Sequence, residues 1–216
     1  MKLNYQTVSP VLMDCLHKLM NHPAFRDFYL VGGTSLSLQR GHRLSIDIDL
    51  FTCAPYGEMN TIEIEAALLE MFPYTDRTDE LHHSQMVYSM YVGGSKENCI
   101  KLDLCYDDPL IFPLIETDGL RIASEKEIAA MKIQAITQTE QRRKDFWDIH
   151  ELLESYTLSE MVDWGMKRYP WSVTKENVKD GIERLSHIKD FTEVVCMKGK
   201  YWEFIVEDLF DEAKNI

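Results

Sequence analysis

The sequence predicts an α/β protein of the α+β kind, in which a sheet with flanking helices is followed by a helical part. Short apolar runs alternate with helical patterns in the first half of the chain, and helical patterns alone fill the second half. The 216 residues can bury a sizeable core, in one large domain or two small ones. We therefore expect an α/β domain over residues 1–120 and a helical domain over 121–216 that completes the active-site cleft.

The first half contains both kinds of pattern. Apolar residues at helical spacing predict helices over 8–21, 34–40 and 60–71. Short apolar or alternating runs predict strands over 28–31, 46–51, 85–92 and 98–105, the last two joined by a turn at Gly93-Gly94. Because side chains alternate along a strand, Ile46, Ile48 and Leu50 are expected to fill the core.

Helix-start signals organise the second half. Ser124-x-x-Glu127 and Thr157-x-x-Glu160 each read as a capping box that opens a helix. Further helices are predicted over 142–156, 175–188 and 200–214.

The formal net charge of -13 argues against a general nucleic-acid binder, which needs a basic footprint. It is compatible with a site that gathers carboxylates around a divalent metal ion. The five cysteines are odd in number and lack C-x-x-C spacing, which is typical of reduced thiols. There is no apolar signal core at the N-terminus and no run long enough to span a membrane, so a cytoplasmic protein without membrane contact is expected.

Asp47 and Asp49 form the first chemical signal. Residues two apart on a strand point the same way, so the two carboxylates would stand together on the face opposite the core. Mg²⁺, or alternatively Mn²⁺, is the natural partner, because a hard cation prefers oxygen ligands. The competing interpretation is an edge strand whose acidic residues face water.

Gly32-Gly33-Thr34-Ser35 forms the second signal, because it links a short strand to a helix. A glycine turn lets the backbone approach a phosphate, and the N–H groups at a helix start favour an anion. Alone this is weak evidence, but together with the Asp47-x-Asp49 pair it predicts a phosphate loop beside a metal site.

Asp103 lies in another alternating run, 100–104. If that strand pairs with 46–51, its carboxylate joins the first two, as two-metal transfer chemistry requires. It could then also act as a general base. The alternative is a solvent-facing residue paired with Lys101 or free.

The run 30–51 closely resembles the first motif of the AbiEii-type nucleotidyltransferase toxins, members of the DNA polymerase β-like nucleotidyltransferase superfamily. It reads Leu-Val-Gly-Gly-Thr-Ser-Leu-Ser-Leu, followed later by His-Arg-Leu-Ser-Ile-Asp-Ile-Asp-Leu-Phe. The segments 130–135 and 143–149 resemble later motifs of the same family, in the same order. The resemblance covers roughly residues 28–155 and implies a polymerase β-like sheet.

The resemblance also implies roles. Triphosphate binding would fall to Gly33, Thr34 and Ser35, and metal binding to Asp47, Asp49 and Asp103, the last at a position that varies more within the family. Lys132 would reach the nucleotide phosphates, and Asp145 would be a further active-site acid.

Several residues keep two interpretations. Lys132 is otherwise an ordinary surface lysine, and Arg43, like His42, either contacts phosphate or caps a loop. The basic run 142–144 is either a solvated helix end or a small patch for nucleic acid. The adjacent pair His82 and His83 would face opposite sides of a strand, which makes a poor metal site.

The sequence thus predicts a metal-dependent enzyme that moves an NMP from an NTP to an acceptor hydroxyl. The resemblance implies a toxin of a toxin–antitoxin or phage-defence system, with a cognate antitoxin and an RNA such as tRNA as acceptor. The alternatives are a small-molecule nucleotidyltransferase of the antibiotic-modifying kind, which the charge favours, and a non-catalytic nucleotide-binding protein of the same fold.

Overall fold

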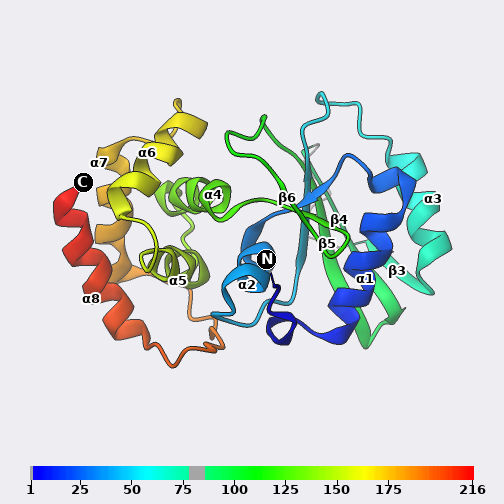
Figure 1. Ribbon diagram of the computed structural model, residues 1–216, viewed down its shortest axis with the longest axis horizontal. Coiled ribbons are helices and arrows are strands. Elements are labelled where there is room, and N and C mark those ends of the chain that lie inside the picture. Colours follow the sequence, from blue (N-terminus) through cyan, green and yellow to red (C-terminus); the bar gives the residue numbers. More distant parts are fainter. Residues whose placement is uncertain (1, 78–85) are drawn as a thin grey trace.

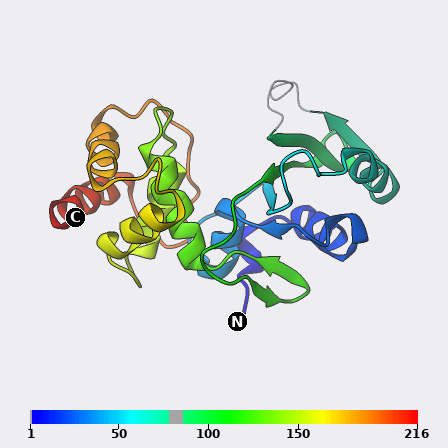
Figure 2. The ribbon, with the colours of Figure 1, turned by 90° about the horizontal axis from the view of Figure 1, so that it is seen from above.

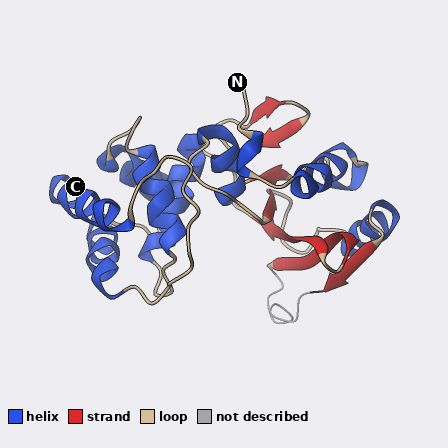
Figure 3. Ribbon diagram, turned by 90° about the horizontal axis from the view of Figure 1, so that it is seen from below, coloured by secondary structure: helices blue, strands red, loops and turns tan. Residues whose placement is uncertain are grey.

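The computed structural model describes residues 2–77 and 86–216. The chain forms two halves that meet at α2 (Gly32–Arg40), with a sheet on one side and a helical cluster on the other (Figure 1). Seen from above and from below, the strands and the helices packed on them lie in one half, and the other half is helical (Figures 2 and 3). The predicted α/β class is confirmed, while the division at residue 120 stays a prediction.

Within the described residues, seven strands form one mixed sheet in the order β3-β4-β5-β2-β1-β7-β6. β2 runs parallel to β5, and β1 runs parallel to β7 and antiparallel to β2. The strands are β1 (Tyr29–Leu30), β2 (Ile48–Thr52), β3 (Tyr74–Arg77), β4 (Val87–Ser95), β5 (Asn98–Tyr106), β6 (Ile115–Thr117) and β7 (Leu120–Ile122).

One face of this sheet is covered by α1 (Pro10–Asn21) and α3 (Thr61–Met71), which share a single core with it. Ser9 caps α1 by accepting a hydrogen bond from the Leu12 N–H, and Asn60 caps α3. Alternate residues of the strands, such as Leu50 on β2, point into this core and are fully buried. The opposite face of β2 and β5 is therefore left for polar side chains.

The helical half packs around α4, which contacts α2, α5, α6 and α7. Its core includes Tyr29, Val31 and Leu36 from the sheet half, so the two halves share apolar contacts. Its helices are α4 (Glu125–Thr137), α5 (Arg143–Leu152), α6 (Leu158–Arg168), α7 (Lys175–Glu183) and α8 (Trp202–Glu212). None of the helices described here is long and apolar enough to cross a membrane.

Two strand predictions were wrong in detail. β2 begins at Ile48, and Ile46 is 73% exposed instead of buried, because the chain before Ile48 runs past α2 without pairing in the sheet. The β4–β5 turn lies at 96–97, whereas Gly93 is within β4. A Cβ at Gly93 would collide with the backbone of Asn98, so this glycine allows a close strand approach at an irregular register. The predicted strand residue Gln85 lies outside the described residues.

The two capping boxes differ. Thr157 and Glu160 form a complete box, as predicted. Ser124 accepts from the Glu127 N–H, but the Glu127 carboxylate instead accepts hydrogen bonds from the backbone N–H groups of Ile111 and Phe112. Glu127 is buried, and tertiary partners therefore outcompete the local cap.

Candidate active site

Two carboxylates stand side by side on the open face of the sheet. Asp49 on β2 is the register partner of Asp103 on the parallel strand β5. Both point away from the face that carries Leu50 and Leu102. Since adjacent strands lie about 4.8 Å apart, the pairing that the sequence made conditional on register is present.

The charge of this pair is only partly balanced. Asp103 accepts a hydrogen bond from the Ser89 hydroxyl and pairs with the Lys101 ammonium at 2.8 Å. Burial, and then the negative charge of Asp103, raise the pKa of Asp49 above its ordinary value. The surroundings of Asp49 thus favour an additional positive charge.

The start of α2 faces the Asp49 carboxylate. Gly32 has a φ of +66°, and a Cβ there would lie 2.5 Å from Asp49 Oδ2. A Cβ at Gly33 would collide with the guanidinium of Arg43. The two glycines are the first residues of α2 and not a separate turn, so the backbone at the helix start comes directly beside the carboxylates.

The hydroxyls of Thr34 and Ser35 point inward. Thr34 donates to the Asp47 carbonyl and lies 2.8 Å from the Ser45 hydroxyl, while Ser35 donates to the Ala123 carbonyl at 3.3 Å. Both side chains are buried. They fix α2 against its neighbours, and backbone groups remain the means by which this loop could bind phosphate.

A second cluster, formed by α4 and α5, lies on the helical side. The Lys132 ammonium bridges Asp145 at 2.6 Å and Asp148 at 2.7 Å, and all three side chains are buried. Burial alone would raise the pKa of Asp145, but Lys132 and then Arg142 hold it below its ordinary value. These groups are ionised and mutually compensating.

Asp148 also holds the segment that follows α2. Arg43 binds its carboxylate through two nitrogens, at 2.6 and 2.8 Å, and His42 Nε2 lies 2.8 Å away. Against the effect of burial, Arg43 and Lys132 keep the pKa of Asp148 well below its ordinary value. Arg43 is thus engaged inside the protein, and its predicted contact with nucleotide stays a prediction.

Asp148 was not singled out from the sequence as a site residue. Its spacing of three from Asp145 shows only that the two share a helix face. The missing information was burial, since a fully buried carboxylate requires cationic partners. A charged residue flanked by Trp147 and Ile149 in an otherwise core-facing helix is the signal that could have indicated it.

Lys144 connects the two clusters. Its ammonium lies 3.9 Å from Asp47 Oδ2, and its side chain is 38% exposed, against 7% for Lys132. Burial, and then the positive charges of Arg142 and Lys132, lower the pKa of Lys144. The structure therefore brings the sheet carboxylates and the helical cations together, while His82 and His83 lie outside the described residues.

The carboxylates suit a hard divalent cation, because they offer oxygen ligands and the Asp49 charge is disfavoured by its neighbour. Within residues 2–77 and 86–216, no three His, Cys, Asp or Glu side chains are already arranged to hold a metal ion. Asp49 and Asp103 are the aligned pair, and Asp47 extends toward Lys144. Metal binding by all three stays a prediction.

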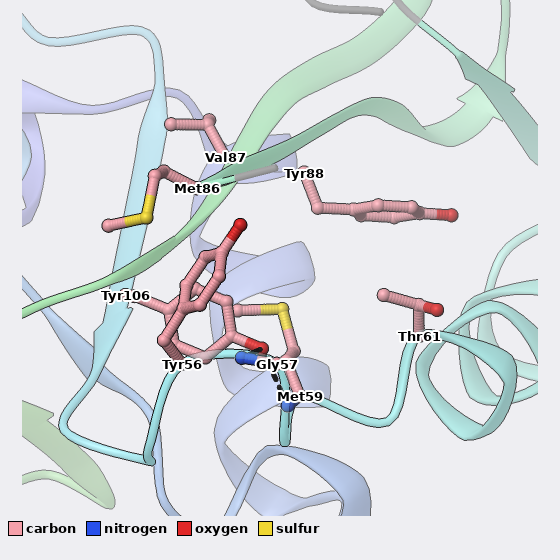
Figure 4. Close-up of a pocket in the computed structure, with 8 residues that line it drawn as sticks. All are labelled: Tyr56, Gly57, Met59, Thr61, Met86, Val87, Tyr88 and Tyr106. Carbon is pink, nitrogen blue, oxygen red and sulfur yellow. Dashed lines mark hydrogen bonds between the residues drawn. The ribbon is translucent and has the colours of Figure 1, made fainter. Parts of the chain in front are cut away.

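A pocket of about 390 Å³ lies elsewhere, between β4, β5 and the loop before α3 (Figure 4). Its Tyr106 hydroxyl accepts hydrogen bonds from the N–H groups of Gly57 and Met59. Tyr88 and Tyr106 belong to the strand face opposite Asp103, so this pocket does not open onto the carboxylates.

Known structures share this architecture. A candidate nucleotidyltransferase from H. pylori superposes with a TM-score of 0.61 at 19% identity, covering 94% of this chain and 90% of that one. The nucleotidyltransferase toxin MenT4 of Mycobacterium tuberculosis H37Rv superposes with a TM-score of 0.59 at 14% identity, covering 95% and 84%. At these identities the likeness shows the fold.

Sequence comparison reaches further. An uncharacterized protein of Aquifex aeolicus (strain VF5) is 28% identical over 205 residues, which is 90% of each chain. The family model for the nucleotidyl transferase AbiEii toxin, type IV toxin–antitoxin system, matches residues 14–195. That match includes both strand carboxylates, the start of α2 and the α4–α5 ion cluster. The chain belongs to the AbiEii nucleotidyltransferase toxin family, and the predicted resemblance and enzyme class are confirmed.

Proposed function

We propose that this protein is a metal-dependent toxin that transfers an NMP from an NTP to a hydroxyl group of an RNA such as tRNA. The observation that carries the proposal is the in-register pair Asp49 and Asp103 beside the glycine-bounded start of α2. One element can hold phosphates while the neighbouring strands hold the cation that accompanies them.

We assign the roles of the site residues by their positions. Asp49 and Asp103, joined by Asp47, would hold Mg²⁺ or Mn²⁺, and the bound ion would neutralise phosphate charge and favour ionisation of the acceptor hydroxyl. The backbone at Gly33 and Thr34 would hold phosphate oxygens. Asp103 lies on the side of Asp49 away from β1 and α2, because β5 follows β2 in the sheet order. An acceptor approaching in line, opposite the leaving pyrophosphate, would therefore arrive on the Asp103 side.

In the proposed reaction, an acceptor oxygen forms a bond to the α-phosphorus as the bond to the bridging oxygen breaks. Pyrophosphate leaves with that oxygen, and we propose that Asp103 receives the acceptor proton. Lys132 and Asp145 belong to the adjoining ion cluster. We assign both residues a positioning role on the cationic, helical side of the site. A direct contact of Lys132 with phosphate would require its ammonium to exchange its present carboxylate partners.

The test is incubation of the purified protein with each labelled NTP, total RNA and Mg²⁺. Label should enter RNA with the wild-type protein and be lost by at least a hundredfold in Asp49→Asn. Wild-type protein that labels no RNA under any NTP would contradict the RNA assignment.

A small-molecule acceptor is the second candidate, favoured by the net charge of -13. A panel of small hydroxylated acceptors, assayed beside RNA, separates the two. An antitoxin partner is tested separately by rescue of growth when a neighbouring gene is expressed together with the toxin.

A further inference from the structure

The basic run at the start of α5 is divided among three environments. Arg142 pairs with Asp145 at 3.0 Å. The Arg143 guanidinium lies over the rings of Phe191 and Trp202, at 5.3 and 5.1 Å from their centres. Neither arginine is therefore simply a solvated helix end.

Lys144 is directed to the site instead. Its nearest carboxylate, Asp47, is 3.9 Å away, well beyond the 2.6–3.0 Å of the ion pairs in the helical cluster. The positive charge of Lys144 also lowers the pKa of Asp49, against the effects of burial and of Asp103, which raise it. This ammonium thus faces the metal-site carboxylates without a close ion pair to either.

The helical side of the site carries more cations than carboxylates. Three cations, Arg43, Lys132 and Arg142, share the two carboxylates Asp145 and Asp148. Lys144 adds a further cation at the edge of this cluster. Once the facing carboxylates Asp47 and Asp49 hold the metal ion of the proposed function, the fixed cations on the helical side favour a multivalent anion over a neutral ligand.

Accessibility distinguishes the cations. Lys132 is enclosed between two carboxylates and nearly inaccessible, whereas the Lys144 side chain is 38% exposed. A ligand can reach Lys144 without breaking a buried ion pair, and it would then lie beside the carboxylates and the start of α2.

We propose that Lys144 is the lysine that binds the triphosphate arm of the nucleotide, and that Lys132 is a positioning residue that keeps α4 and α5 together beneath it. This inference rests on the proposed nucleotide-transfer function and names the residue that meets its polyphosphate. A lysine suits the role because it acts as a mobile point charge with three donors.

The experiment uses inorganic tripolyphosphate as the probe, titrated calorimetrically into the full chain in the presence of Mg²⁺. Lys144→Ala should raise the dissociation constant roughly tenfold, the effect expected for one lost charge-assisted contact. Lys144→Arg should retain most of the binding. The matched control is Lys179→Ala, a partly buried lysine on α7, which should bind as wild type.

A second measurement separates binding from positioning. Lys132→Met should lower the melting temperature by several degrees, because two buried carboxylates lose a shared cation, whereas Lys144→Ala should leave it nearly unchanged. Unchanged tripolyphosphate binding in Lys144→Ala overturns the proposal. A Lys144→Ala variant that loses RNA binding but keeps its affinity for tripolyphosphate overturns it as well.

The outcome is distinguishable from that of the proposed function. If wild type binds tripolyphosphate through Lys144 but labels no acceptor, the inference stands and the transfer function fails. If wild type labels RNA while Lys144→Ala keeps full affinity for tripolyphosphate, the transfer function stands and the inference fails.

Discussion

Asp49 and Asp103 face each other across one rung of a parallel strand pair. Their separation is therefore set by backbone hydrogen bonding and not by the packing of flexible loops. Such a pair is held together although its charges repel, which means that folding stabilises an arrangement that is unfavourable in the absence of a cation.

This strain predicts a gain in stability on removing one charge. In metal-free buffer, Asp49→Asn should raise the melting temperature by roughly 2–4 °C, corresponding to about 1 kcal/mol. The pKa of Asp49 is raised in the folded protein, so its charged form opposes folding as the pH rises above the unfolded value. Calorimetry near neutral pH measures this, and a lower melting temperature in Asp49→Asn would contradict it.

Divalent cations should reverse the order of stability of the wild type and Asp49→Asn. Mg²⁺ at about ten times its dissociation constant should stabilise the wild type by roughly 1.4 kcal/mol, and EDTA should remove the gain. Asp49→Asn should lose this response. Because Asp47 extends toward Lys144, Asp47→Asn should lose less of it, and an equal loss in both variants would indicate that Asp47 binds the metal as closely as Asp49.

Asp148→Asn is expected to be the most destabilising of the single charge removals. The carboxylate is fully buried and pairs with Arg43, His42 and Lys132. Its loss leaves buried cations without enough anionic partners, which should lower the free energy of unfolding by about 3–5 kcal/mol. Urea unfolding measures the effect. Asp208→Asn is the control, because its ion pair with His150 involves a carboxylate that is 59% exposed.

Asp148 also predicts how the stability of the folded protein depends on acidic pH. The folded pKa values of Asp145 and Asp148 are lowered, so their contribution is complete above the unfolded value of about 4 and is lost as the pH falls through the folded values. Stability of the wild type should therefore fall in acid more steeply than that of Asp148→Asn. Parallel curves would show that Asp148 does not carry this dependence.

Gly32→Ala tests the contact between α2 and β2. Gly32 and Gly119 both have positive φ, so either substitution costs about 1–2 kcal/mol of backbone strain. Only at Gly32 does the new Cβ approach Asp49, whereas at Gly119 nothing lies within 4 Å. Transfer activity should fall at least tenfold in Gly32→Ala and remain near wild type in Gly119→Ala.

The sequence predicted what depends on local pattern. Alternation placed Asp49 on the polar face of a strand, and the spacing of apolar residues located the main helices. It could not assign Ile46, because alternation continues past the point where the chain leaves the sheet. A strand's length depends on its partners, and those are distant in sequence.

Long-range pairing limited the site prediction in the same way. The proximity of Asp103 to Asp49 depended on which strands became neighbours, and the sequence could state it only conditionally. Two partners of Asp148, His42 and Arg43, lie more than a hundred residues before it in the sequence. At Glu127 the sequence did contain a local capping signal, but the carboxylate accepts hydrogen bonds from distant backbone N–H groups instead.

The bond between Arg43 and Asp148 has a consequence for engineering. It ties the segment between α2 and β2 to the helical half, so the two halves are not interchangeable modules. A chimera that joins this sheet to a relative's helices would have to transplant residues 42–43 together with 132–148. Swapping the helical half alone would leave a buried arginine facing a foreign surface.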